Sequence, residues 1–260
     1  MLYYPASILA NRDAESMLTC HRRPGSKNIE EESGVIRNPK VMVKRFVLLV
    51  LVALSIVTTR AVIAAVSAPT MSAGDSLKLL LEGNQRFIDG KLEHPNQTVA
   101  RRTEVAKGQH PFAAMLACSD SRTPPEIIFD RGLGDLFVVR VAGNVADQVV
   151  IESLDYSVKH LGVRLVMILG HNRCGAVTAA VAGHEEEGDV GPMLTELRPA
   201  VEASKGAAGN PVENAVRENV KLVMKKIATS EELSAMVKSG ELQIVGGIYD
   251  LDTGKIEMMK

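Results

Sequence analysis

Hydrophobic positions after residue 70 recur with different periods, and each period predicts a different kind of element. Leu77, Leu80, Leu81 and Phe87 share one face of a helix that begins near residues 72–75. Continuous apolar runs instead predict buried strands, at 112–117, 136–141 and 165–169. Similar patterns predict the remaining elements: helices at 98–107, 150–161, 174–182, 191–203, 211–228 and 231–239, and strands at 242–249 and 255–259.

Helices separate most of the predicted strands, and this order favours an α/β fold with a mainly parallel central sheet covered by helices on both faces. A turn at 252–254 joins the last two strands, and loops are expected at 183–191 and 203–210. Because parallel strands end at one edge of a sheet, residues that follow the strands at 112–117 and 165–169 are expected to meet at that edge.

The first 68 residues follow a different pattern. Residues 1–41 are polar and lack a sustained period, so we expect them to be disordered or to reflect a start codon assigned too early. Residues 42–68 contain two basic residues, then a 12-residue apolar run, then several small residues. This order is typical of a signal peptide and predicts export, to the periplasm or out of the cell. An uncleaved membrane anchor is the alternative, although Arg60 interrupts the apolar span.

Charge is distributed unevenly along the 260 residues. Residues 1–68 carry nine Lys and Arg against five Asp and Glu, whereas residues 69–260 carry 21 against 26. The acidic second part has no basic runs or exposed-aromatic motifs, so nucleic acid is not an expected partner. Without the leader, roughly 190 residues remain, which is enough for one domain with a substantial core.

Two of the three cysteines, Cys118 and Cys174, lie close to predicted strand ends, and His171 precedes Cys174 by three residues. Two thiolates and an imidazole suit zinc, and three protein ligands leave a fourth position for water, as in catalytic sites. A disulfide between Cys118 and Cys174 is the alternative in an oxidising compartment, and bound zinc would prevent it. Cys20 lies outside the expected mature chain.

Asp120 and Arg122 follow Cys118 within four residues. Zinc lowers the pKa of bound water from about 15.7 towards 7, so hydroxide would be available as a nucleophile near neutral pH. Two roles are open to Asp120. It orients that hydroxide while Arg122 holds its carboxylate, or it binds zinc as a fourth ligand and closes the site.

Four segments resemble the β-class carbonic anhydrases. Residues 117–122 read ACSDSR and residues 170–175 read GHNRCG, which are similar to the two metal-binding motifs of that family and occur in the same order. Residues 137–144, FVVRVAGN, resemble the strand and turn beside its active site, and residues 245–250, VGGIYD, resemble its last strands. The resemblance covers about residues 75–260, which we expect to form the catalytic domain.

The resemblance implies one Zn2+ per subunit, bound by Cys118, His171 and Cys174, with an Asp120–Arg122 dyad beside it. It also implies a set of substrate-pocket residues: Gln109, which hydrogen-bonds the substrate, Phe137, which forms an apolar wall, and Ala142 and Gly143 in the turn where this chain departs from the plant-type sequence. The chain lacks the tryptophan of the bicarbonate-regulated members, so we expect an accessible, water-bound site near neutral pH.

The implied activity is the reversible hydration of CO2 to bicarbonate and a proton through zinc-bound hydroxide. The family also implies a homodimer or tetramer with an N-terminal helical arm around the partner and pockets at the subunit interface. Contact with a membrane is expected only through an uncleaved N-terminal segment. Two alternatives remain: hydrolysis of a sulfur analogue, carbonyl sulfide or carbon disulfide, on the same zinc site, and a non-catalytic zinc or redox sensor.

Overall fold

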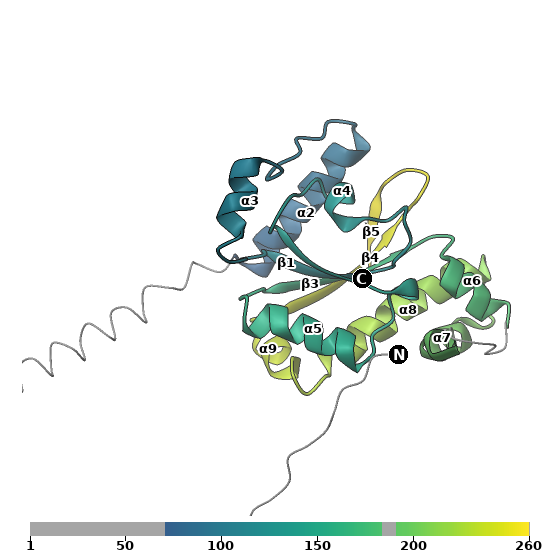
Figure 1. Ribbon diagram of the computed structural model, residues 1–260. Helices are drawn as coiled ribbons and strands as arrows, with labels where there is room; N and C mark the ends of the chain where they lie inside the picture. Colours follow the sequence, from purple (N-terminus) through teal and green to yellow (C-terminus); the bar gives the residue numbers. More distant parts are fainter. Residues whose placement is uncertain (1–70, 184–190, 260) are drawn as a thin grey trace, which may run out of the picture. The chain divides into compact units, whose positions relative to one another are not determined.

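A five-stranded sheet forms the centre of the computed structural model, which describes residues 71–183 and 191–259 (Figure 1). The strand order is β2-β1-β3-β4-β5, and every pair is parallel except β4 with β5. The strands are β1 (Ala113–Ala117), β2 (Leu136–Arg140), β3 (Leu165–His171), β4 (Gln243–Tyr249) and β5 (Ile256–Met258). The predicted mainly parallel α/β fold is therefore confirmed.

Helices cover both faces of this sheet. Figure 1 shows α2 and α4 on one side, and α5, α8 and α9 on the other, with α6 and α7 beside α8. The helices are α2 (Ala73–Ile88), α3 (Val99–Val105), α4 (Pro125–Ile128), α5 (Gln148–Lys159), α6 (Gly175–Val181), α7 (Gly191–Ser204), α8 (Pro211–Ala228) and α9 (Ser234–Ser239). Their limits lie within three residues of the predicted ones, and only α4 was not predicted.

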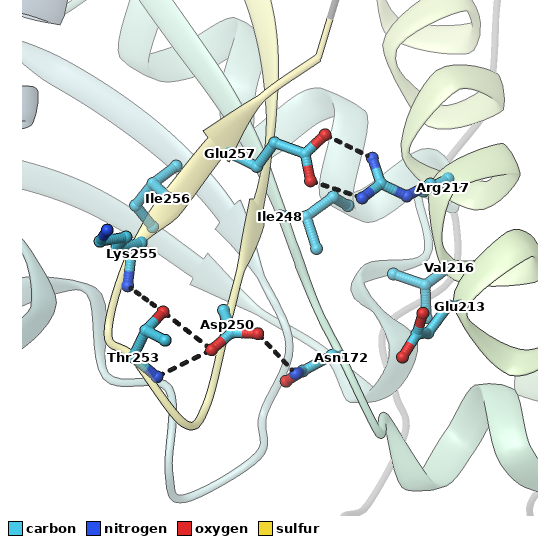
Figure 2. A pocket seen from close by; sticks show the side chains of 10 residues that line it. All are labelled: Asn172, Glu213, Val216, Arg217, Ile248, Asp250, Thr253, Lys255, Ile256 and Glu257. Atoms are coloured by element: carbon cyan, nitrogen blue, oxygen red, sulfur yellow. Dashed lines mark hydrogen bonds and ion pairs between the residues drawn. The ribbon is translucent and has the colours of Figure 1, made fainter. Parts of the chain in front are cut away.

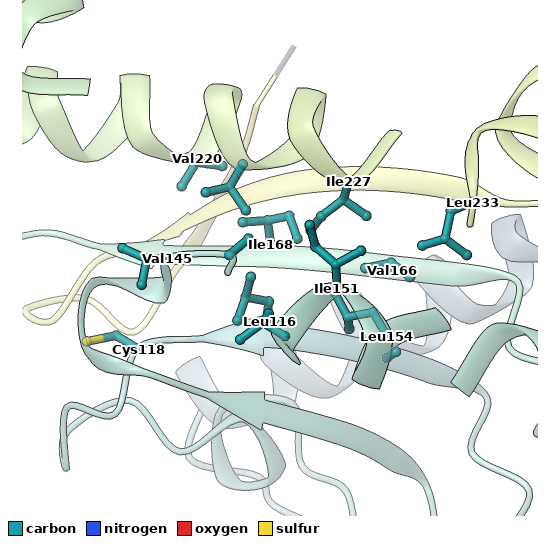
Figure 3. Close-up of a cluster of buried hydrophobic side chains, with 14 of the residues drawn as sticks. Leu116, Cys118, Val145, Ile151, Leu154, Val166, Ile168, Val220, Ile227 and Leu233 are labelled. Carbon is teal, nitrogen blue, oxygen red and sulfur yellow. The ribbon is translucent and has the colours of Figure 1, made fainter. Parts of the chain in front are cut away.

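Alternating side chains of β1 separate two hydrophobic clusters. Ala114 and Leu116 point into the cluster formed with α5, α7 and α8, whereas Met115 packs with Leu80 of α2 on the opposite face. Strand side chains alternate between the two faces of a sheet, so Cys118 continues the series of Ala114 and Leu116. Figure 3 shows Cys118 at the end of this series, beyond Leu116.

Side chains that accept hydrogen bonds from backbone amides begin several helices where the sequence changes from polar to amphipathic. Ser72 accepts from the amide of Asp75 at the start of α2, and Asp147 accepts from that of Val150 at the start of α5. Asn210 accepts from two amides at the start of α8. Such caps satisfy amides that have no partner within the helix and contribute about 1 kcal/mol each.

The expected disordered segment 1–41 and the expected leader 42–68 lie outside the described residues, as does most of the predicted loop 183–191. Export and the limits of the catalytic domain therefore stay predictions. Within residues 71–183 and 191–259, no helix combines the length and the apolar character that crossing a membrane would require.

Candidate metal centre

Three potential metal ligands meet at the carboxyl edge of the sheet. Cys118 follows β1 directly, His171 is the last residue of β3, and Cys174 immediately precedes α6. Strands β1 and β3 are hydrogen-bonded neighbours, so their carboxyl ends lie side by side. The two Sγ atoms and a ring nitrogen of His171 lie within 4.8 Å of one another, and all three side chains are buried.

The imidazole of His171 is arranged as a metal ligand would be. Its Nδ1 hydrogen-bonds the backbone carbonyl of Asn172 at 2.9 Å, which leaves Nε2 with the lone pair. Nε2 is buried and has no hydrogen-bond partner among the described residues. Burying a polar nitrogen without a hydrogen-bond partner costs free energy unless another group binds its lone pair. A metal ion held by the two neighbouring thiols would bind it.

The two thiols are free and share a hydrogen bond, with 3.9 Å between their sulfur atoms. The hydrogen bond from Cys174 lowers the pKa of Cys118, and the backbone amide of Gly143 adds to this effect by donating to Cys118 Sγ at 3.3 Å. The same thiol–thiol bond, together with burial, raises the pKa of Cys174. Of the two sulfur atoms, Cys118 Sγ is therefore the one whose thiolate form is favoured, because it accepts the backbone amide of Gly143.

Asp120 and Arg122 form a two-pronged ion pair beside these ligands. Arg122 donates from Nε to Asp120 Oδ1 at 2.9 Å and from a terminal nitrogen to Oδ2 at 2.7 Å. These bonds hold the pKa of Asp120 well below its ordinary value. Oδ2 lies 3.8 Å from Nε2 of His171, so an ionised carboxylate faces the position where a metal and its water would lie.

Arg140 and Asn219, neither of which was predicted as a site residue, support this arrangement. Arg140, at the end of β2, donates to the backbone carbonyls of Cys118 and Asp120 at 3.0 and 2.6 Å. Asn219 is a buried polar residue on the apolar face of α8, and it donates to the carbonyl of Gly143 at 2.8 Å. In the sequence, Asn219 stands out as a polar residue among the valines of α8, and a buried polar side chain needs a hydrogen-bond partner.

Gly143 lies in the short 3-10 turn η2 (Ala142–Asn144), which was not predicted as an element. Its φ of 69° belongs to the left-handed region, and a Cβ on this residue would come within 3.1 Å of Leu197. Glycine therefore fits where a side chain would strain both the backbone and the packing. This conformation allows its amide to reach Cys118, so the predicted residue Gly143 does lie at the metal centre.

Two predicted pocket residues lie away from the three ligands. Gln109 is exposed and precedes the amino end of β1, whereas Cys118 follows the carboxyl end. Five strand residues at about 3.3 Å each separate those ends by about 17 Å. Phe137 pairs with Ala114 near the amino end of β2, and its ring lies 6.2 Å from that of Tyr156. Of the predicted pocket residues, only the turn of Ala142 and Gly143 lies near the ligands within one chain.

Comparisons with known proteins agree with this geometry. A family model described as carbonic anhydrase matches residues 113–256. Carbonic anhydrase 2 of Mycobacterium tuberculosis is 42% identical over 186 residues, which cover 68% of this chain and 88% of that protein. The structure of the β-carbonic anhydrase CafA of Aspergillus fumigatus is 34% identical with a TM-score of 0.55, covering 61% of this chain and 80% of that one. A Coccomyxa β-carbonic anhydrase in complex with acetazolamide is 25% identical with a TM-score of 0.57, covering 69% and 84%.

Proposed function

This chain belongs to the β-class carbonic anhydrase family and is a carbonic anhydrase, and on that premise we propose that Cys118, His171 and Cys174 bind one zinc ion per subunit for the reversible hydration of CO2. The observation that carries this proposal is the buried Nε2 of His171, which has no hydrogen-bond partner in the described part of the chain and lies beside two free thiols. Bound zinc would lower the pKa of water enough to make it a nucleophile near neutral pH.

Asp120 is the residue that would orient this water. Its carboxylate stays ionised because Arg122 lowers its pKa, so it can only accept hydrogen bonds. Arg122 holds both carboxylate oxygens, and Oδ2 still has capacity for a further donor on the side of His171. The arrangement favours the orienting role over direct metal binding, because a turn of Asp120 towards the metal would break the two bonds to Arg122.

We further propose that the substrate pocket is completed by a second copy of the chain. Gln109 lies at the opposite end of β1 from the metal centre, so a role at the substrate requires a Gln109 from another subunit. Strand β2 ends the described sheet and its five residues are partly exposed, with Val149 and Tyr156 exposed on the neighbouring helix α5. An edge strand beside apolar side chains is a suitable surface for a homodimer.

The zinc proposal is tested by stopped-flow CO2 hydration from pH 6 to 9, with Cys174→Ser as the matched variant that lacks one ligand. We expect hydration that depends on zinc and rises through about pH 7, as a group of that pKa ionises. Cys174→Ser should lose both zinc and activity. Zinc-loaded protein that hydrates no CO2 would contradict the proposal. Turnover of carbonyl sulfide or carbon disulfide by that protein would then support the sulfur alternative.

The shared pocket is tested by mixing two inactive variants. Subunits with Cys174→Ser keep Gln109, and subunits with Gln109→Ala keep the metal ligands. A mixed dimer then contains one site with both. Because equal amounts of the two subunits form about half mixed dimers after random exchange, activity should recover to about a quarter of that of the parent. If mixing recovers no activity although mixed dimers form, Gln109 does not act across the interface.

The apolar pattern at 42–68 supports a further proposal, that the enzyme is exported and its leader removed. N-terminal sequencing of the protein purified from its native cells tests this. A first residue between 65 and 70 is the expected result, and an intact residue 42 in a membrane fraction would indicate the anchor instead.

A further inference from the structure

The loop between His171 and Cys174 is fastened to the turn that joins β4 to β5. Asn172 makes three hydrogen bonds to this turn and the strand end before it. Its backbone N–H donates to the carbonyl of Tyr249 at 3.1 Å. In its side chain, Nδ2 donates to Asp250 Oδ2 at 3.0 Å and Oδ1 accepts from the backbone N–H of Leu251 at 3.0 Å. Figure 2 shows the Asn172–Asp250 bond in the wall of a cavity of about 360 Å³.

Asp250 is itself fixed by the turn in which it lies. Its Oδ1 accepts from the amides of Asp252 and Thr253, at 3.1 and 2.7 Å, and from the Thr253 hydroxyl at 2.8 Å. The bonds from Thr253, with the smaller effect of Asp252, outweigh burial and lower the pKa of Asp250. An ionised carboxylate accepts and never donates, so Oδ2 selects the NH2 end of the Asn172 amide.

The backbone carbonyl that accepts the hydrogen bond from His171 Nδ1 also belongs to Asn172. On the other side of that peptide, Arg173 has a left-handed φ of 52° and donates to Asp252 Oδ1 at 2.8 Å. The peptide group is therefore held from both ends by residues 249–252. Its carbonyl selects the His171 tautomer with hydrogen on Nδ1, which keeps the Nε2 lone pair directed at Cys118 and Cys174.

We propose that Asp250, acting through the Asn172 side chain, is a positioning residue that sets the tautomer and the ring orientation of His171. This inference rests on the proposed zinc site, and it assigns to the β4–β5 turn a role in holding the metal. Strands β1 and β3 bring Cys118 and His171 to the same edge of the sheet through their register alone. The imidazole needs a further constraint, because a histidine ring can rotate and exchange its proton between two nitrogens.

Exchange of the two side chains tests whether the contact between positions 172 and 250 acts on the metal site. Asp250→Asn alone allows two NH2 groups to face each other, and Asn172→Asp alone brings two carboxylates together. The double variant Asn172→Asp/Asp250→Asn restores both contacts, because a carboxylate at 172 accepts from the amide of Leu251 and from the new NH2 at 250. Recovery by the pair of changes would assign the effect to this contact, and a spectroscopic readout at the metal would separate a change at the His171 ring from a general loss of stability.

The experiment measures the rate at which zinc passes from the full-length protein to a chromogenic chelator, together with the visible spectrum of the cobalt-substituted protein. Outer partners of a metal-bound histidine typically contribute 10- to 100-fold to metal affinity. We therefore expect each single variant to lose zinc about 10-fold faster with altered cobalt bands, and the double variant to return to within about 3-fold of the parent.

Arg217→Gln is the matched control, because it breaks the ion pair with Glu257 on β5 without touching the metal loop. It should lose zinc at the parent's rate. The inference is overturned if the single variants hold zinc like the parent, or if the folded double variant loses it as fast as they do. A parent protein that binds no zinc contradicts the zinc site itself, so the two failures are distinguishable.

Discussion

Two aspartate–arginine ion pairs in this enzyme have similar contacts, but we expect one to support catalysis and the other to stabilise the fold. In the pair beside the candidate metal centre, Asp120 and Arg122 are two residues apart, and their side chains are 16% and 52% exposed. In the other pair, Asp130 and Arg86 are 44 residues apart and the Asp130 side chain is only 1% exposed. The separation along the chain and the burial of the carboxylate determine which pair supports chemistry and which supports the fold.

The remaining bonds of each carboxylate explain this difference. Asp130 accepts from Arg86 at 2.6 Å and from the amides of Glu93 and His94, both at 3.0 Å, which joins the end of α2 and the following segment to the end of α4. Among residues 71–183 and 191–259, the Asp120 carboxylate accepts only from the side chain and the backbone amide of Arg122, and it keeps one side open towards His171. A carboxylate with free capacity can serve a substrate or water, whereas a saturated one stabilises the chain.

The largest expected effect comes from Asp120→Asn. An amide at this position can donate where the carboxylate only accepts, so it no longer orients the nucleophile, and kcat for CO2 hydration should fall about 1,000-fold. The melting temperature should change little, because the Arg122 side chain is 52% exposed and its ion pair is screened by solvent. Stopped-flow rates and thermal melting of one zinc-loaded preparation measure both. Turnover close to that of the parent would show that Asp120 does not orient the nucleophile.

The reverse pattern is expected for Asp130→Asn. Removing the buried charge of this ion pair leaves Arg86 with only the exposed carboxylate of Glu93, at 3.6 Å, and the free energy of unfolding should fall by about 3 kcal/mol. The turnover of the folded protein should stay at the parent's value, because Asp130 does not contact the metal ligands. Urea unfolding followed by circular dichroism measures the stability. A variant as stable as the parent would show that the pair contributes nothing to the fold.

A smaller effect is expected from pH, and it sharpens the contrast. Burial alone would raise the pKa of Asp130, but the bonds from Arg86, Glu93 and His94 outweigh it and the net shift is downward. A lowered folded-state pKa stabilises the protein above the unfolded value of about 3.9, and this contribution disappears as the pH falls through the lower folded value. The stability difference between parent and Asp130→Asn should therefore narrow below about pH 4. Melting of the metal-free proteins from pH 7 to 3 measures it, and a constant difference would contradict the assignment.

Hydrophobic periodicity was sufficient for the fold but not for its shortest parts. The apolar run at 112–117 predicted β1 almost to the residue, because a strand buried on both faces admits few polar side chains. Helix α4 and the turn η2 contain four and three residues, too few for any period to show. Their conformations depend on Pro125 and on the fit of Gly143 against Leu197, which become visible only in three dimensions.

The proposed metal ligands were predictable from residue type, and their partners were not. Cysteine and histidine at two strand ends indicate a metal site in the sequence itself. Gln109 was predicted from its match to a family position, and that match does not reveal that a strand of about 17 Å separates it from Cys118. Asp250 is 78 residues from Asn172, and only the pairing of β3 with β4 brings them together.

If zinc binds as proposed, the placement of its ligands on neighbouring strands links metal binding to folding. His171 and Cys174 are three residues apart and would form only a two-ligand chelate before the chain has folded. Cys118 would join them when β1 docks beside β3, which closes a loop of 53 residues between Cys118 and His171. Complete coordination would therefore require a closed sheet, and part of the zinc binding energy would become folding energy that resists the separation of these two strands.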